Sequence, residues 1–114
     1  MSRDDATLLD ILRAARLVTE FKGKLAKQAF LRDIKTQSAI LHQLLVIGEA
    51  VKRLSEDFSA QHPEIPWLRI AGMRDKLIHA YDTVDLDEVW KTVTKDIAPL
   101  ISFLKPLVPK EKIK

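Results

Sequence analysis

Apolar side chains recur at helical spacing from the start of the chain. Positions 8, 12, 15, 18 and 21 are apolar and lie three or four residues apart, while charged residues stand between them. This spacing is typical of an amphipathic helix, and it predicts one over about residues 3–21. Ser2, with Asp5 three residues later, resembles a capping box at its start, and Gly23 stands beyond its end. A shorter helical stretch is expected over 25–31.

A wide apolar stripe follows Asp33, which can cap a long helix reaching about Ser59. A stripe of this width is typical of a helix that is packed on two sides. One side could face the core of the domain and the other a partner subunit. The stripe consists of two neighbouring rows, with Leu41, Leu44, Gly48, Val51 and Phe58 in one and Ile40, Ile47 and Leu54 in the other.

The second half of the chain predicts two further helices. Residues 62–66 contain two prolines and should form a loop, with Pro66 in the first turn of a helix that ends near Ala80. Asp85 resembles a second helix cap, and the helix after it keeps one apolar face to Leu104, with a kink expected at Pro99. The sequence therefore predicts an all-α fold, a four- to five-helix up-and-down bundle.

Composition narrows the class of protein further. We expect one domain, 1–114, with a basic, frayed tail from about residue 105. The absence of cysteine excludes disulfides, thiol nucleophiles and cysteine zinc sites. No apolar run approaches the ~18 residues of a spanning helix, and the N-terminus does not resemble a signal peptide, so we expect a cytoplasmic protein without membrane contact. A net charge of +3 is compatible with a phosphate-bearing partner but is small for a dedicated nucleic-acid binder.

Several kinds of site are disfavoured by the residues present. Three isolated glycines cannot form a Gly-rich phosphate cradle, so the P-loop and the dinucleotide fingerprint are absent. No histidine belongs to a His-Glu-x-x-His pattern. Asp75 and His79 stand at i and i+4, but two such ligands are too few for a metal site. We therefore expect neither metal nor cofactor.

The candidate catalytic side chains that remain lie in the segment from Arg74 to Tyr81. Their types are suited to cleaving RNA. A neutral imidazole such as His79 can take the proton of a ribose 2′-hydroxyl, and the guanidinium of Arg74 can stabilise charge on the phosphate oxygens. On an ideal helix these two side chains are rotated by about 140° from each other, so two copies of the segment in a symmetric dimer would be needed to join them. The plainer alternative remains open: Tyr81 as a half-buried ring, and Asp75 as an ordinary surface ion-pair partner.

The spacing Arg74-x-x-x-x-His79-x-Tyr81 resembles the R-x-x-x-x-H-x-Y signature of HEPN-domain toxins of the HepT type. The short motif is weak alone, but the likeness covers nearly the whole chain, up to about Leu104. Further segments that resemble this family, in the same order, are 2–4, 35–39, 47–50, 63–67, 72–75 and 84–90.

This resemblance implies a function and a set of partners. Proteins of this type are homodimeric helical bundles, encoded beside a nucleotidyltransferase antitoxin of the MntA type. The toxin is a metal-independent ribonuclease that cuts tRNA or mRNA. The resemblance makes Arg74 and His79 the catalytic pair, gives Asp75 an assisting role, and makes Tyr81 the residue that the antitoxin modifies with AMP.

Two questions stay open at the level of sequence. The chain could instead be a non-catalytic HEPN module that docks a nucleotidyltransferase or holds a nucleotide, whereas a DNA-binding regulator is disfavoured because no helix-turn-helix with a basic recognition helix is present. Glu49 interrupts an otherwise apolar helix. It is either a buried hydrogen-bonding partner of the active helix or an ordinary exposed residue.

Overall fold

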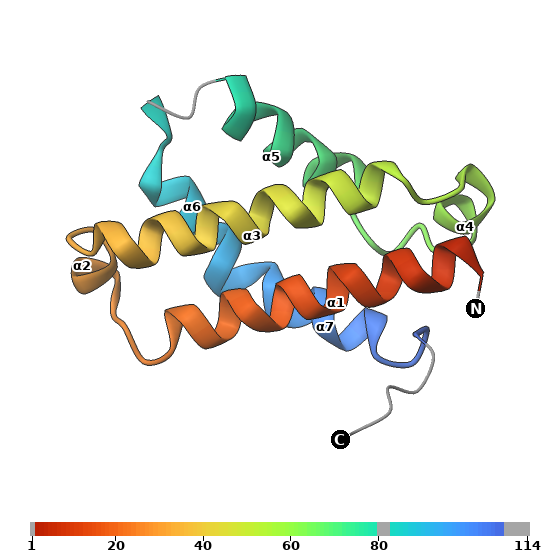
Figure 1. Ribbon diagram of the computed structural model, residues 1–114, viewed down its shortest axis with the longest axis horizontal. Coiled ribbons are helices and arrows are strands. Elements are labelled where there is room, and N and C mark those ends of the chain that lie inside the picture. Colours follow the sequence, from red (N-terminus) through yellow and green to blue (C-terminus); the bar gives the residue numbers. More distant parts are fainter. Residues whose placement is uncertain (1, 80–82, 109–114) are drawn as a thin grey trace.

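The computed structural model describes residues 2–79 and 83–108, which form seven helices and no strand (Figure 1). This confirms the predicted all-α bundle. None of the helices in these two ranges is long and apolar enough to cross a membrane. The helices are α1 (Arg3–Lys22), α2 (Lys27–Phe30), α3 (Ile34–Lys52), α4 (Glu56–Gln61), α5 (Trp67–His79), α6 (Leu86–Lys95) and α7 (Ile97–Leu104).

Local capping signals place most helix starts where the sequence predicts them. At α1 the backbone N–H of Asp5 donates to Oγ of Ser2 at 3.0 Å, and the reciprocal bond of the capping box is also present. Asp33 caps α3 by accepting from the backbone N–H of Thr36 at 3.0 Å. Asp85 caps α6 in the same way. Each cap satisfies backbone N–H groups that have no partner within the helix.

Helix α3 is the centre of the bundle. It lies between α1 and α5, and it contacts both (Figure 1). Its apolar rows supply fully buried core residues such as Ile40 and Ile47. The wide stripe predicted a helix packed on two sides, and this is confirmed. The second side, however, is covered by α5 of the same chain, so the stripe does not require a partner subunit.

The prediction of one continuous helix from Asp33 to about Ser59 is wrong. Helix α3 ends at Lys52, and Ser55 starts α4 by accepting a hydrogen bond from the backbone N–H of Phe58 at 3.1 Å. The carboxylate of Asp4, at the start of α1, accepts from the backbone N–H of Ser55 at 3.0 Å and from its hydroxyl at 2.6 Å. These bonds stabilise a break that the apolar spacing does not reveal, since it continues at helical steps through the break.

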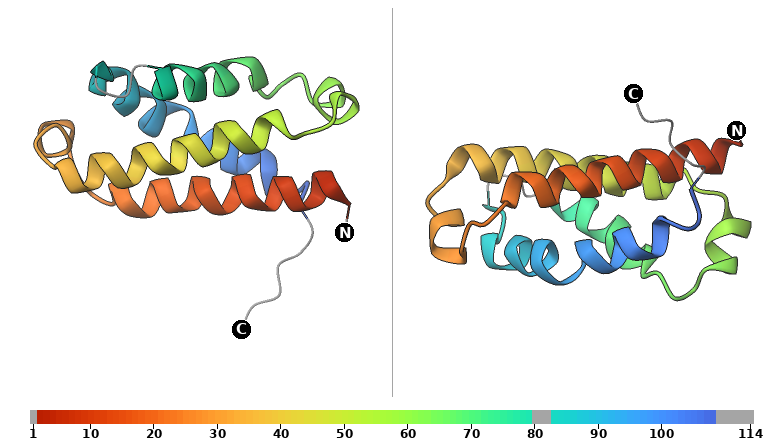
Figure 2. Two further views of the ribbon diagram at one scale, coloured as in Figure 1. Left: turned by 45° about the horizontal axis from the view of Figure 1, so that its top comes forward. Right: turned by 90° about the horizontal axis from the view of Figure 1, so that it is seen from below.

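The kink expected at Pro99 divides the predicted helix into two segments at Asp96. Helix α6 ends at Lys95, four residues before Pro99, and α7 follows after Asp96. A proline ring clashes with the carbonyl four residues earlier and cannot donate to it, so the helix ends there. Figure 2 shows α6 and α7 following each other along one side of the α1–α3 pair. After α7, residues 105–108 form a turn in which Leu107 packs against the core, and the rest of the tail lies outside the described residues.

Candidate active site

The middle of α5 crosses α3 at very short range, and Gly48 makes this crossing possible. A Cβ atom built on Gly48 would stand 2.1 Å from Cβ of Arg74 and 3.3 Å from its Cα. Real side chains do not approach this closely, so only glycine fits at this position of α3. The close approach brings Arg74 and its neighbour Asp75 within reach of polar side chains on α3.

Arg74 contacts two carboxylates. Its Nη1 donates to Oδ1 of Asp75 at 2.9 Å, and its Nε forms an ion pair with Oε1 of Glu49. The Nε atom is buried, and its approach to Glu49 lacks the alignment of a hydrogen bond. The Arg74 side chain is 23% exposed, against 47% for Glu49. Glu49 is therefore an exposed ion-pair partner of the α5 arginine, and this differs from both sequence interpretations: it contacts the active helix, but it is neither buried nor aligned for a hydrogen bond.

Asp75 joins Arg74 to a second cation on α3. Its Oδ1 accepts from Nζ of Lys52 at 2.6 Å as well as from Arg74. The hydrogen bond from Lys52, and after it the one from Arg74, hold the pKa of the Asp75 carboxyl below its usual range. The hydrogen bond to Asp75 raises the pKa of Arg74 above its ordinary value. At neutral pH Asp75 is therefore a carboxylate that cannot donate a proton, and Arg74 is a permanent cation.

His79 lies apart from this cluster. It is the last residue of α5, it is exposed, and among the described residues it has no hydrogen-bond or ion-pair partner. Five residues along an ideal helix correspond to about 140° of rotation and about 7.5 Å of rise. The i, i+4 pair Asp75 and His79 makes no contact either, because Asp75 turns to Lys52 and Arg74. One protomer thus presents Arg74 and His79 on different sides of α5, as the sequence predicts.

Two further expectations concern groups around this helix. Tyr81, the residue expected to carry AMP, lies outside the described residues, so the structure does not place it. Within residues 2–79 and 83–108, no three His, Cys, Asp or Glu side chains are grouped closely enough to hold a metal ion.

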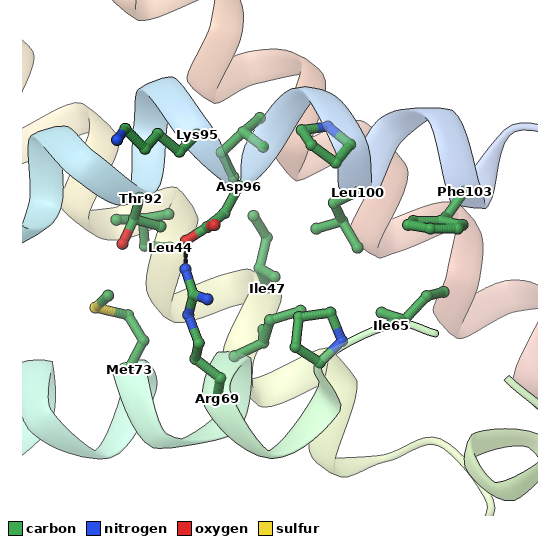
Figure 3. Close-up of a pocket in the computed structure, with 14 residues that line it drawn as sticks. Leu44, Ile47, Ile65, Arg69, Met73, Thr92, Lys95, Asp96, Leu100 and Phe103 are labelled. Carbon is green, nitrogen blue, oxygen red and sulfur yellow. Dashed lines mark hydrogen bonds and ion pairs between the residues drawn. The ribbon is translucent and has the colours of Figure 1, made fainter. Parts of the chain in front are cut away.

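A pocket of about 110 Å³ lies between α5, α3 and the α6–α7 segment, away from Arg74 and His79 (Figure 3). Apolar side chains from all of these helices line it, among them Ile47, Met73 and Phe103, and the ion pair between Arg69 and Asp96 crosses it. Pockets that hold drug-sized ligands or cofactors have about 300–1,000 Å³. This pocket is too small and too apolar to hold a nucleotide, so it gives no support to the alternative in which the bundle does so.

One residue of the cluster was missed at the level of sequence, and this is Lys52. A lysine in the last turn of a helix is ordinarily explained by the helix dipole, so nothing in its immediate neighbours points to Asp75. The available signal was its spacing from Glu49. The two stand at i and i+3 and share one face of α3, on the side where Gly48 interrupts the apolar row.

Comparison with known proteins shows which family the sequence resembles. A family model described as "Ribonuclease HepT-like" matches residues 11–107, a range that contains the whole segment from Arg74 to Tyr81. A protein of Thermococcus cleftensis named "Probable ribonuclease HepT" is 50% identical over 93 residues, which are 82% of this chain and 84% of that protein.

More distant relatives point to the same family. A Methanocaldococcus jannaschii protein whose name describes a candidate RNase is 38% identical over 103 residues, 90% of this chain and 85% of its own length. A similarly named protein of Caldanaerobacter subterraneus is 41% identical over 96 residues, 84% of this chain and 85% of its own length. No solved structure matches the chain at a significant level. The match of sequence over most of the chain agrees with the helical bundle and with the resemblance in the motif: the chain belongs to the HepT-like ribonuclease family.

Proposed function

We propose that this chain is a metal-independent endoribonuclease that cuts tRNA or mRNA and acts as the toxin of a type VII-like toxin–antitoxin pair. The observation that carries the proposal is the family match, which spans Arg74 and His79, combined with the position of both residues on one helix, α5. Relatives named as ribonucleases support the same reaction class.

The chemistry follows from the two side chains. Acting as a base, the imidazole of His79 takes the proton of a ribose 2′-hydroxyl, whose oxygen then attacks the adjacent phosphorus. The bond to the 5′-oxygen breaks, and that oxygen takes a proton from water, which leaves a 2′,3′-cyclic phosphate and a 5′-hydroxyl. Arg74 stabilises the negative charge that builds on the non-bridging oxygens. Asp75 assists by accepting a hydrogen bond from Arg74, which orients the guanidinium. Because the nucleophile is the neighbouring hydroxyl, these steps need no metal.

The separation of Arg74 and His79 on α5 favours a homodimer as the active form. A two-fold axis near this helix would bring Arg74 of one copy toward His79 of the other, so that each of two sites takes one residue from each chain. Such a site between subunits requires His79 to be exposed on the surface of one protomer, and it is exposed.

A nucleotidyltransferase antitoxin of the MntA type is the proposed partner, and Tyr81 is the proposed target. An AMP group on Tyr81 would add negative charge and bulk two residues from His79. Such an adduct would compete with the RNA phosphate for Arg74 and fill the site.

The ribonuclease proposal predicts cleavage of RNA without metal. Purified protein incubated with total tRNA and an mRNA in the presence of EDTA should yield discrete fragments, because neither the base nor the cation is a metal. Gel electrophoresis of the products measures this, and a parallel reaction with added Mg²⁺ serves as the control. Intact RNA in both reactions, together with normal growth of cells that express the chain alone, would favour the non-catalytic binding module.

The antitoxin proposal predicts a change of mass. Protein produced together with the nucleotidyltransferase encoded beside it should gain one or more AMP units on Tyr81 and lose its ribonuclease activity. Intact-mass measurement followed by peptide mapping detects the adduct, and a Tyr81→Phe chain produced in the same way is the control. An unchanged mass, or an adduct that persists in the phenylalanine variant, would contradict the assignment of Tyr81.

A further inference from the structure

Two charged residues of α3 lie beside the proposed catalytic residues of α5. Glu49 contacts Nε of Arg74, and Nζ of Lys52 donates to Asp75 at 2.6 Å. Glu49 and Lys52 are one turn apart on the same face of α3. They are within reach because Gly48 allows the backbone of α5 to approach α3. Each proposed catalytic group on α5 that makes a polar contact is thus held by a partner on a different helix.

The contacts of Arg74 define the orientation of its guanidinium. The group is planar, and its donors stand in a rigid fork. Glu49 contacts the Nε side and Asp75 contacts Nη1, so two points of the plane are held from two helices. Neither of these two contacts involves Nη2, the remaining nitrogen of the guanidinium. A cation that is oriented before the substrate arrives loses less freedom when a phosphate binds, and it stabilises developing charge more effectively.

Lys52 changes the electrostatics of the same cluster. Arg74 faces two carboxylates, Glu49 and Asp75, whose combined charge exceeds its own. Without a further cation the cluster would carry a net charge of −1 and would repel a phosphodiester. Lys52 brings the sum to zero by pairing with Asp75, while all four side chains keep contact with solvent.

We propose that Glu49 and Lys52 are positioning residues of the ribonuclease site: Glu49 orients the guanidinium of Arg74, and Lys52 neutralises Asp75 so that a phosphodiester can approach that guanidinium. This inference rests on the ribonuclease function proposed above. It adds two residues of α3 to a site whose motif residues all lie on or just after α5.

The role of Glu49 predicts a difference between two substitutions. Glu49→Ala removes the carboxylate that contacts Nε and should lower kcat about tenfold with little change in KM, because the guanidinium is then held at Nη1 alone. Glu49→Gln keeps an oxygen at the same place and should retain most of kcat. Steady-state cleavage of an RNA oligonucleotide measures both, and Glu20→Ala and Glu20→Gln on the outer side of α1 are the matched controls. Equal kcat for wild type and Glu49→Ala would overturn the role.

The role of Lys52 predicts an effect on binding. Lys52→Met keeps most of the stem but leaves the cluster of Arg74, Glu49 and Asp75 with a net negative charge, so KM should rise about threefold to fivefold at low salt. Lys52→Arg should restore the wild-type KM. The Asp75→Asn/Lys52→Met double variant has the same net charge in the cluster as wild type, so its KM should return to about the wild-type value. Arg53→Met, at the next position of the chain and facing Asp10, is the control. An unchanged KM in Lys52→Met, or a KM in the double variant as high as in Lys52→Met alone, would refute the role of Lys52.

A spectroscopic measurement separates failure of this inference from failure of the ribonuclease proposal. The Nε–H signal of Arg74 in a ¹⁵N NMR spectrum should shift and exchange faster with solvent in Glu49→Ala than in wild type. If wild-type protein cleaves RNA and this signal is the same in both, the positioning inference alone is wrong. If wild-type protein cleaves no RNA, the proposed function is wrong, and the inference about its site falls with it.

Discussion

Replacing His79 with alanine should lower the rate of RNA cleavage by roughly 10²-fold or more while leaving the stability of the protein unchanged. The loss follows from removal of the group that accepts the 2′-hydroxyl proton. Stability should not change because His79 is exposed at the end of α5 and has no hydrogen-bond or ion-pair partner among the described residues. Single-turnover cleavage of a labelled RNA gives the rate, and thermal unfolding gives the stability.

A matched substitution makes this result specific. His42→Ala changes another exposed histidine, on α3, and should leave the cleavage rate within about twofold of wild type. Arg74→Ala should lose activity as strongly as His79→Ala, but it also removes the ion-pair partner of Glu49 and Asp75. The histidine variant is therefore the cleaner test. Cleavage by His79→Ala at the wild-type rate would exclude the imidazole as the base.

Mixing the two inactive variants tests whether each site takes residues from both chains. A heterodimer of Arg74→Ala and His79→Ala chains contains one site that lacks both residues and one site that is intact. If Arg74 and His79 of different protomers act together, the refolded mixture should recover about a quarter of wild-type activity, since half of the dimers are mixed and each carries one functional site. No recovery, with heterodimers present by native mass spectrometry, would place both residues of a site in one chain.

Local signals in the sequence were sufficient to predict the helical framework. Ser2, Asp33 and Asp85 each act within three residues along the chain, so their caps are visible without any tertiary structure. The break at Ser55 has a local cap of the same kind, since Ser55 accepts from the backbone N–H of Phe58. Its further bonds to Asp4, which lies 51 residues earlier in the chain, form only in the folded bundle. Apolar spacing does not reveal a break of this kind when the helical spacing continues through it.

The candidate site likewise has a part that the sequence predicts and a part that it does not. Arg74, Asp75 and His79 belong to one short segment, and helical geometry alone predicts that Arg74 and His79 point to different sides of α5. The contacts of this segment with α3 depend on how two helices cross, and no pattern within a single helix determines that crossing. This is why the pairing of Asp75 with Lys52 emerged only from the structure. Gly48 belonged to the apolar row in the sequence, yet its role is to provide space for Arg74.

The glycine at this crossing leads to the prediction with the largest expected effect on stability. Gly48→Ala should lower the free energy of unfolding by about 1–3 kcal/mol, because the new Cβ would stand 2.1 Å from Cβ of Arg74 and the two helices must separate. An alanine in a helix is otherwise favoured over glycine by roughly 1 kcal/mol, so a net loss can come only from the clash. Chemical denaturation monitored by circular dichroism measures the change.

The chain contains its own control for this substitution. Gly72 lies in the middle of α5, and a Cβ built there meets nothing within 4 Å. Gly72→Ala should therefore raise the free energy of unfolding by up to about 1 kcal/mol, the opposite sign for the same chemical change. Gly48→Ala should also reduce RNA cleavage, since separation of α3 from α5 draws Arg74 away from Glu49 and Asp75 away from Lys52. If both alanine variants were equally stabilising, the close crossing would be absent in solution, and the two-helix cluster built on it could not form.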